Sequence, residues 1–260
     1  MYKLHLGDCL EILPTLDAGS IDAIITDLPY GTTACKWDTV IPFVPMWKEV
    51  KRVLKHNGVF VTTASQPFTS ALVMSNIDMF KYEWIWNKRS PVGFLNVKIK
   101  PMLVHENIVV FCEGTGNYNP QFRKTLTKLF GKRGNGSGDV YGKLKNDVNS
   151  GVGYPFSLIS DYPKVNNLSG GGLHPTQKPV ALYEYLIRTY TNEGDTVLDI
   201  CMGSGTTIVA AIRTGRNAIG IEKDAEFGYM EIAEKRCKEA ELQPVLFRSQ
   251  LSNPTQKELL

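Results

Sequence analysis

The fold of this chain is decided by residues 21–31, which read IDAIITDLPYG. Their first five residues form a near-continuous apolar run between turn residues, which is typical of a buried strand in a parallel sheet. Asp27, Pro29 and Tyr30 therefore follow the carboxyl end of a strand, where open α/β sheets bind their ligands. An acidic acceptor, a rigid turn and an aromatic face suit a planar ring that carries an exocyclic amino group. An ordinary turn explains the same residue types, because Asp, Pro and Gly all favour turns.

A second stretch, residues 197–207, favours the ligand-binding interpretation. It reads VLDICMGSGTT, which is typical of a strand, a glycine turn and the start of a helix. Glu222 follows a further apolar run at 218–221. Glycines let the backbone approach a ligand closely, and an acid about 20 residues further on can bind ribose hydroxyls. Because the chain has 23 glycines, a pair of glycines alone is weak evidence for a binding site. The strand before this turn and the acid after it make the ligand-binding interpretation stronger.

Together these stretches resemble the amino-methylating DNA methyltransferases that use S-adenosylmethionine. Residues 27–30 resemble the family's catalytic Asp-Pro-Pro-Tyr, with Leu28 in place of the first proline, and residues 199–205 resemble its cofactor loop. The catalytic motif comes first and the cofactor loop last, which is the permuted order called the β group. The resemblance covers most of residues 1–240. It implies a doubly wound α/β fold with a mostly parallel, seven-stranded sheet and an inserted recognition lobe.

The chain is expected to divide into four regions. Residues 1–112 and 173–241 form the catalytic and cofactor-binding halves of one methyltransferase domain, and residues 242–260 form a tail with little pattern. In residues 113–172 turn residues are frequent, apolar periodicity fades, and basic side chains outnumber acidic ones. An insert of this length is usually functional or disordered, and in the family this position holds the target-recognition region.

Hydrophobic periodicity predicts the remaining elements. Strands are expected at 2–6, 59–61, 80–87, 108–111 and 217–222. Helices are expected at 43–54, 67–74, 180–190 and 203–214, and a final helix is expected from about Asp224 to about Glu241. Aromatic residues alternate along 80–87, which favours packing against a helix over stacking on bases.

The resemblance implies methyl transfer to the exocyclic amine of a flipped DNA base. Asp27 and the carbonyl of Leu28 accept the amine hydrogens, Pro29 holds the turn rigid, and Tyr30 stacks on the base. Adenine N6 is favoured over cytosine N4, because the motif begins with Asp where many cytosine-N4 enzymes have Ser. Methylation at cytosine carbon 5 is disfavoured, since that chemistry uses a Pro-Cys pair and this chain has none.

The predicted cofactor site combines the glycine loop with two other segments. A Gly-Asp pair near the N-terminus lies beside the adenine in the family, although Asp8 is equally well explained as the N-cap of a short helix. The hydroxyl of Thr176 and the cation of Lys178 suit the carboxylate of the methionine end. The predicted cofactor-binding residues are Asp8, Cys9, Asp27, Thr176, Lys178, Asp199, Cys201, Gly203, Ser204, Gly205, Thr206, Glu222 and Lys223.

The predicted DNA contacts come from three segments, of which the first is polar and the other two are basic. Residues 32–38 resemble a loop that closes over the flipped base, although an ordinary surface loop is an equal alternative. Residues 88–100 resemble a variable connection near DNA, and the basic insert suits phosphate contacts. The predicted DNA-binding residues are Lys36, Trp37, Lys88, Arg89, Arg123, Lys124, Lys132 and Arg133.

Length and composition agree with a soluble enzyme, which is expected to be cytoplasmic, and the resemblance implies double-stranded DNA as its partner. The chain has 260 residues and a net charge of +3, which permits a nucleic-acid partner without requiring one. The five scattered cysteines are expected to be reduced thiols, and no stretch is apolar enough to span a membrane. No metal is expected, because the His105-Glu106 pair lacks a metal-binding pattern. A homodimer and a partner restriction endonuclease stay open.

Rival functions belong to other classes. A nicotinamide-dependent oxidoreductase would use the glycine turn as a dinucleotide site, but residues 27–30 would then have no role. An inactive DNA-binding module would retain the cofactor site as a relic. A protein or RNA methyltransferase is a lesser alternative, because such relatives usually place the cofactor loop first.

Overall fold

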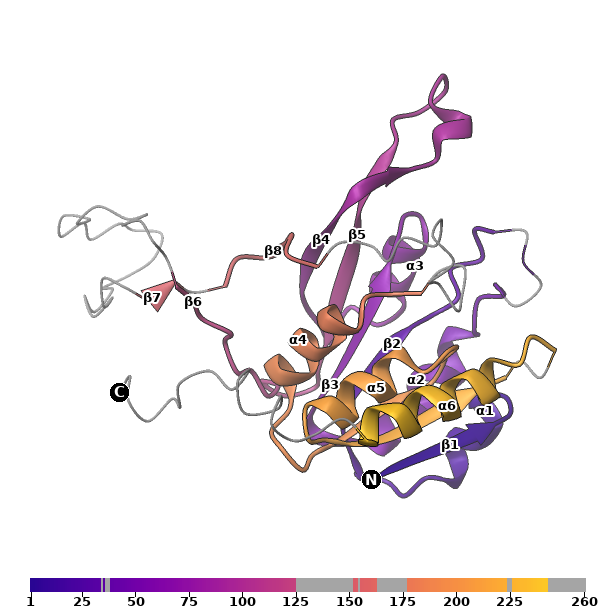
Figure 1. The fold of residues 1–260 in the computed structure, drawn as a ribbon, viewed down its shortest axis with the longest axis vertical. Helices are drawn as coiled ribbons and strands as arrows, with labels where there is room; N and C mark the ends of the chain where they lie inside the picture. The colour runs from indigo at the N-terminus through magenta and orange to yellow at the C-terminus, as the bar shows by residue number, and fades with distance from the viewer. Residues whose placement is uncertain are drawn as a thin grey trace. The chain divides into compact units, whose positions relative to one another are not determined.

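The computed structural model describes residues 1–33, 35, 38–124, 152–153, 155–162, 177–223 and 226–242. One eight-stranded sheet dominates this part of the chain (Figure 1). In spatial order its strands are β1 (Tyr2–Leu6), β10 (Asn217–Glu222), β9 (Thr196–Asp199), β2 (Ile21–Asp27), β3 (Leu54–Ala64), β5 (Leu103–Phe111), β4 (Phe80–Val92) and β8 (Leu158–Ile159). Neighbours from β1 to β3 are parallel, and β5 is antiparallel to both β3 and β4.

The predicted fold class is confirmed, with one difference in the number of strands. The sheet is mostly parallel, but it has eight strands where seven were expected. The additional strand, β8, has only two residues and pairs with Ile85 and Trp86 of β4. It lies in a turn-rich part of the sequence where two apolar residues give no period-two signal.

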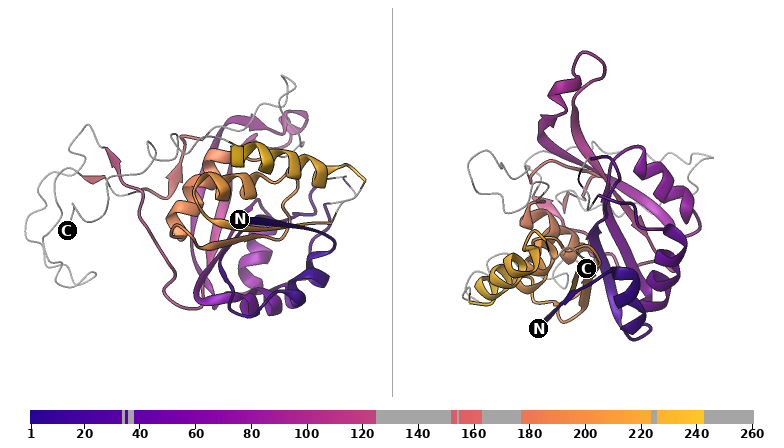
Figure 2. Two further views of the ribbon diagram at one scale, coloured as in Figure 1. Left: turned by 60° about the horizontal axis from the view of Figure 1, so that its bottom comes forward. Right: turned by 90° about the vertical axis from the view of Figure 1, so that its right-hand side faces the viewer.

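Helices cover both faces of the sheet (Figure 2). One core packs Ala23 and Ile25 of β2 against α4 (Val180–Tyr190), α5 (Thr206–Arg213) and α6 (Tyr229–Leu242). The other core packs Ile24 against α1 (Cys9–Ile12), α2 (Phe43–Val53) and α3 (Phe68–Ser75), with the 3-10 turn η1 (Leu13–Thr15). Because β2 is buried on both faces, its sequence is a continuous apolar run.

Most predicted elements are confirmed, but several boundaries differ. The strands predicted at 80–87 and 108–111 are longer in the structure, as β4 (Phe80–Val92) and β5 (Leu103–Phe111). The strand predicted at 59–61 begins at Leu54, so residues 55–58, expected to lie between the helix and the strand, belong to β3. The helix expected from 203 begins at Thr206, because Gly203 and Gly205 adopt positive φ angles of 50° and 79°. The alternating aromatics do pack against a helix: the Trp84 indole donates to the Tyr190 hydroxyl of α4 at 2.7 Å.

The chain divides into two compact units. Residues 1–119 and 157–260 form the main unit, and residues 120–156 form a second one. In the second unit β6 (Arg123–Lys124) pairs antiparallel with β7 (Val152–Gly153). Residues 113–119 and 157–162, which the sequence placed in the recognition region, belong to the main unit. Among the described residues, no helix combines the length and apolar character that a membrane crossing requires.

A long hairpin formed by β4 and β5 projects from the sheet (Figure 1, top). The 3-10 turn η2 (Phe94–Asn96) lies at its end. The strands of this hairpin also carry Trp86, Lys88 and Glu106, which line the cavity described next. The hairpin therefore begins at the rim of that cavity.

Candidate active site

A cavity of about 650 Å³ opens at the carboxyl ends of the central parallel strands. Asp27 ends β2, Asp199 ends β9 and Glu222 ends β10, and all three residues line this cavity. The strands are close neighbours in the sheet, so acids far apart in the sequence meet at one edge. The two stretches that the sequence singled out thus form one site, which we call the carboxyl-edge pocket.

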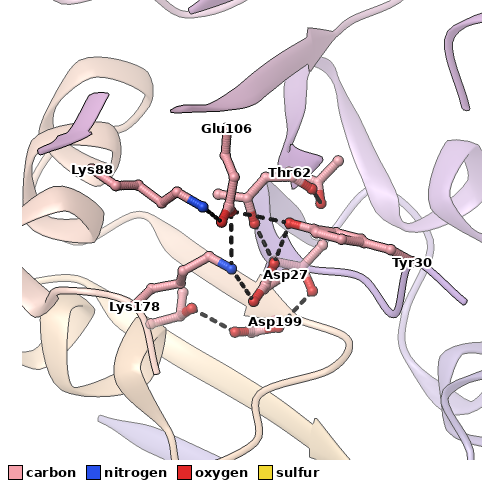
Figure 3. Close-up of polar contacts among 10 residues, drawn as sticks. Asp27, Tyr30, Thr62, Lys88, Glu106, Lys178 and Asp199 are labelled. Atoms are coloured by element: carbon pink, nitrogen blue, oxygen red, sulfur yellow. Dashed lines mark hydrogen bonds and ion pairs between the residues drawn. The ribbon is translucent and has the colours of Figure 1, made fainter. Parts of the chain in front are cut away.

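The carboxylate of Asp27 is held by three side chains (Figure 3). The hydroxyls of Tyr30, at 2.9 Å, and Thr63 donate to one oxygen. The ammonium of Lys178 donates to the other oxygen at 2.8 Å. Burial raises the pKa of Tyr30 well above its ordinary value, and the charges of Asp27 and Glu106 raise it further, so the hydroxyl remains a donor. Asp27 is therefore an acceptor with a fixed orientation at the pocket wall.

The other residues of the motif support this arrangement. The Leu28 side chain is buried in the core on the α1–α3 side, so an apolar leucine is accommodated in place of the family's proline. The Tyr30 ring stacks on Phe68 with centroids 5.3 Å apart. The Lys178 ammonium lies 5.7 Å from the centroid of the Tyr30 ring. The orientation of the ring is thus fixed by an aromatic contact and by a cation.

Four alternating charges follow one side of the pocket, and we call them the charge chain. Lys178 lies 2.8 Å from Asp27 and 3.2 Å from Glu106, and Lys88 lies 3.0 Å from the other oxygen of Glu106. Figure 3 shows Lys178 between the two carboxylates, with Lys88 beyond Glu106. At most a quarter of any of these side chains is exposed, so solvent screens their interactions less than it would at the surface.

Glu106 was not predicted to be a site residue. Burial opposes its ionisation, but the ammonium groups of Lys178 and Lys88 hold the pKa of this carboxyl below its ordinary value. In the sequence, Glu106 is an acid just before an apolar run, and we considered it only as part of a His-Glu pair that could bind a metal. Burial lowers the pKa of Lys178, yet Asp27 and Glu106 together raise it above its ordinary value. Glu106 and Lys178 therefore favour their charged forms at neutral pH.

Two predicted lysines form ion pairs within the protein. Lys88, expected at DNA phosphates, is 4% exposed and paired with Glu106, so its charge is directed into the protein. Lys178, expected at the cofactor carboxylate, already donates to Asp27 and Glu106. Both lysines line the carboxyl-edge pocket. Both lysines therefore belong to the same group of charges as Asp27.

Asp199 anchors the glycine loop from within the protein. It is 2% exposed and accepts from the Thr26 hydroxyl at 2.7 Å, the Cys201 amide at 3.0 Å and the Thr207 hydroxyl at 2.5 Å. Burial raises the pKa of Asp199 to about 6, although the hydrogen bonds from Thr207 and Thr26 lower it. The bond from Thr26 is notable because Thr26 precedes Asp27. One side chain thus fixes the glycine loop beside residues 26–30.

The glycine loop is further fixed by Glu222 and by α6. A carboxylate oxygen of Glu222 accepts from the Gly203 amide at 2.7 Å. A Cβ at Gly205 would lie 2.9 Å from that of Ala233, so close packing on α6, besides its positive φ, requires a glycine there. Arg236 donates to the hydroxyls of Ser204 at 2.9 Å and Thr206 at 3.3 Å. Gly205 is therefore explained by helix packing, while Gly203, Ser204 and Thr206 line the pocket.

The N-terminal segment also contributes to the carboxyl-edge pocket. Asp8 caps α1 by accepting from the Leu10 amide at 2.9 Å, which confirms the N-cap alternative. Its other oxygen accepts from Lys223 at 2.8 Å, and this hydrogen bond lowers the pKa of Asp8. Asp8, Cys9, Cys201 and Lys223 all line the pocket, and all five cysteines are free. Asp8 can therefore cap the helix and face the pocket at once.

The loop after the catalytic motif is organised by Asp38. Its buried carboxylate accepts from the amides of Gly31 at 2.8 Å, Thr32 at 2.9 Å and Thr33 at 2.7 Å. Burial raises the pKa of Asp38, but these and related hydrogen bonds outweigh it and leave the pKa lowered. Thr32, Thr33 and Asp38 line the pocket. Asp38 therefore holds the backbone of residues 31–33 in place at the pocket wall.

Several predicted residues lie outside the described part of the chain. These are Lys36, Trp37, Lys132, Arg133 and Thr176. Arg123 and Lys124 are described only as the backbone of β6. Arg89 is exposed, and its guanidinium donates to the Ser160 carbonyl at 2.6 Å.

The fold and this pocket define the class of the protein as an S-adenosylmethionine-dependent methyltransferase. The chain belongs to the DNA methylase family N6_N4_Mtase, whose model matches residues 21–235. It is 57% identical to type II methyltransferase M2.DpnII of Streptococcus pneumoniae over 91% of this chain and 89% of that protein. It is 30% identical to DNA adenine methyltransferase YhdJ of Escherichia coli K12, over 85% of this chain and 78% of that protein. The crystal structure of the M1.HpyAVI–SAM complex superposes with a TM-score of 0.59 at 26% identity, over 91% of this chain and all of that one.

Proposed function

We propose that this DNA methyltransferase moves a methyl group from S-adenosylmethionine to N6 of adenine in a specific DNA site. The observation that carries the proposal is the position of Asp27. It is a carboxylate with a fixed orientation, in the same pocket as the acids that end β9 and β10. An acceptor for an amine and a site for a nucleoside-like ligand are thereby adjacent.

The residues present fit S-adenosylmethionine. The pocket volume of about 650 Å³ is in the range of cofactor sites, and its wall contains a buried acid at the end of β10. Glu222 would hold the ribose hydroxyls, Asp8 and Cys9 would lie at the adenine, and the loop of Gly203 would approach the cofactor closely. When bound, the cofactor supplies a methyl group on a sulfonium, which makes that methyl electrophilic.

Asp27 and Leu28 would orient the amine, and Asp27 would stabilise its charge. Asp27 and the Leu28 carbonyl would accept its two N–H groups, which directs the nitrogen lone pair toward the methyl group. The nitrogen gains a bond to carbon as the carbon–sulfur bond breaks, and it then carries a positive charge and a surplus proton. Asp27 would stabilise that charge and accept that proton. Orientation and a preorganised carboxylate thus supply the rate gain, and no covalent intermediate is needed.

Adenine is proposed as the acceptor base over cytosine. The support is the Asp at the start of the motif and the likeness to YhdJ, which is named a DNA adenine methyltransferase. The alternative, cytosine N4, belongs to the same family by its name. The test is to methylate genomic DNA, digest it to nucleosides and analyse them by mass spectrometry. We expect N6-methyldeoxyadenosine, and N4-methyldeoxycytidine alone would overturn the choice of base.

DNA is proposed to contact the projecting hairpin and residues 113–172. Arg89, Lys98 and Lys100 are exposed on the hairpin, and the sequence has no acid between residues 88 and 105. Such a surface suits phosphates. Double-stranded DNA is the proposed substrate, and rates on matched duplex and single-stranded oligonucleotides test this. A homodimer is also proposed, and analytical ultracentrifugation of the protein tests it. A partner restriction endonuclease is proposed as well, and a search of the neighbouring genes tests that.

The rival functions are separated by two measurements. Calorimetry with S-adenosylmethionine and with NAD distinguishes a methyltransferase from an oxidoreductase. Methyl transfer to genomic DNA distinguishes an enzyme from an inactive DNA-binding module. Binding of NAD alone, or cofactor binding without methyl transfer, would contradict the proposal.

A further inference from the structure

We propose that Glu106 is a positioning residue that offsets the charge of Lys178, so that Asp27 keeps its negative potential for the amine. This inference rests on the proposed role of Asp27 in methyl transfer. Its basis is the charge chain, in which Lys178 is shared between Asp27 at 2.8 Å and Glu106 at 3.2 Å.

The sheet itself holds these groups together. Asp27 ends β2, Thr63 on the adjacent β3 donates to it, and Glu106 lies on β5, the next strand. Glu106 pairs in register with Trp86 of β4, and the side chain of Lys88 reaches back to it from two residues further along. Since three neighbouring strands fix the carboxylates and Thr63, Glu106 has a defined position relative to Asp27.

The charges decide what Glu106 does for the reaction. With Glu106 ionised, the two lysines and two acids sum to zero. Without it, two ammonium groups would face one carboxylate beside a nitrogen that becomes positive during methyl transfer. In a site with little solvent screening, that surplus positive charge opposes the reaction. A residue that only filled space would not show such a dependence on net charge.

Substitutions that change the net charge stepwise test this idea. Lys88→Met leaves a net charge of −1, wild type and Glu106→Gln/Lys88→Met are neutral, and Glu106→Gln leaves +1. We expect single-turnover methylation by Glu106→Gln to be roughly 10–100-fold slower than wild type, below the full effect of losing a direct contact. The double variant should recover much of that loss, and Lys88→Met should be at least as fast as the double variant. Cofactor affinity by calorimetry should stay within about twofold throughout.

A matched control is Glu83→Gln, which makes the same change on β4. Glu83 is exposed and accepts from Asn107, next to Glu106, outside the pocket. It should keep wild-type rates. Circular dichroism checks folding, and if Glu106→Gln does not fold, the comparison of Lys88→Met with the double variant still tests the rank order.

The outcomes separate this inference from the proposed function. A double variant that is no faster than Glu106→Gln would overturn the charge-offset role, as would a Glu106→Gln rate equal to wild type. In both cases a dead Asp27→Ala variant leaves the proposed function standing. An active Asp27→Ala variant would instead remove the basis of both.

Discussion

The carboxylate of Glu222 accepts a hydrogen bond of 2.7 Å from the amide of Gly203, although the two residues belong to different strand–helix units. The glycine loop is thus held at the end of β10. Glu222 both anchors this loop and lines the carboxyl-edge pocket.

Replacing Glu222 should weaken cofactor binding. Glu222→Ala removes the proposed ribose acceptor and the anchor of Gly203, so we expect a loss of about 1–3 kcal/mol in binding free energy. Calorimetry with S-adenosylmethionine measures it. Glu239→Ala, at an exposed site on α6, is the control and should bind normally. Unchanged affinity for Glu222→Ala would remove this residue from the site.

Replacing Asp27 should abolish most turnover, whereas replacing Cys35 should not. Asp27→Ala removes a preorganised polar group, so we expect single-turnover methylation to fall by about 10²–10³-fold while cofactor binding survives. Cys35 is exposed and is the nearest thiol in the sequence, so Cys35→Ser tests a covalent route. An inactive Cys35→Ser beside an active Asp27→Ala would overturn direct transfer to an amine.

Neutralising the basic insert should weaken DNA binding. Replacing Arg123, Lys124, Lys132 and Arg133 with alanine should lower affinity and flatten its salt dependence, because each lost phosphate contact reduces the slope by about 0.9. Cofactor affinity should not change. The matched control replaces four exposed lysines on α2 and α6, namely Lys48, Lys51, Lys235 and Lys238. An equal salt slope for both variants would show that the insert does not meet phosphate.

The contribution of Asp199 to stability should depend on pH. Burial raises its pKa from 3.8 to about 6, so the folded protein holds a proton at this site more tightly than the unfolded chain. The site therefore stabilises the fold most below about pH 4, and this advantage is lost as pH rises to about 6. Relative to Asp199→Asn, the unfolding free energy of wild type should fall over that window and then level off. Denaturant titrations from pH 4 to 8 measure it, and a difference that rises with pH would contradict the expectation.

The parallel core and the convergence of its acids could be predicted from the sequence. Strands that are buried on both faces have near-continuous apolar sequences. In neighbouring parallel strands, a polar residue that follows each apolar run lies at the same edge of the sheet. Asp27, Asp199 and Glu222 follow that rule and line one pocket, as expected.

The charge chain could not be predicted in this way. Lys88 and Glu106 meet because Trp86 pairs with Glu106 in the β4–β5 register, and register between two strands leaves no mark on either one alone. A lysine followed by an arginine near a turn is usually exposed to solvent. For this reason Lys88 was expected to lie on the surface and contact DNA. The two residues of β8 were missed because so short a strand exists only through its partner.

The second compact unit leaves the main one after Asn119 and returns to it at Ser157, and its described strands, β6 and β7, pair only with each other. The alignment of Asp27 with the glycine loop depends instead on β2, β9 and the bond between Thr26 and Asp199. We therefore expect that the segment between those two points can be exchanged without loss of the methyl-transfer chemistry. If that segment reads the DNA, new sequence preferences can arise by recombination at two sites, with no further adjustment of the reaction centre.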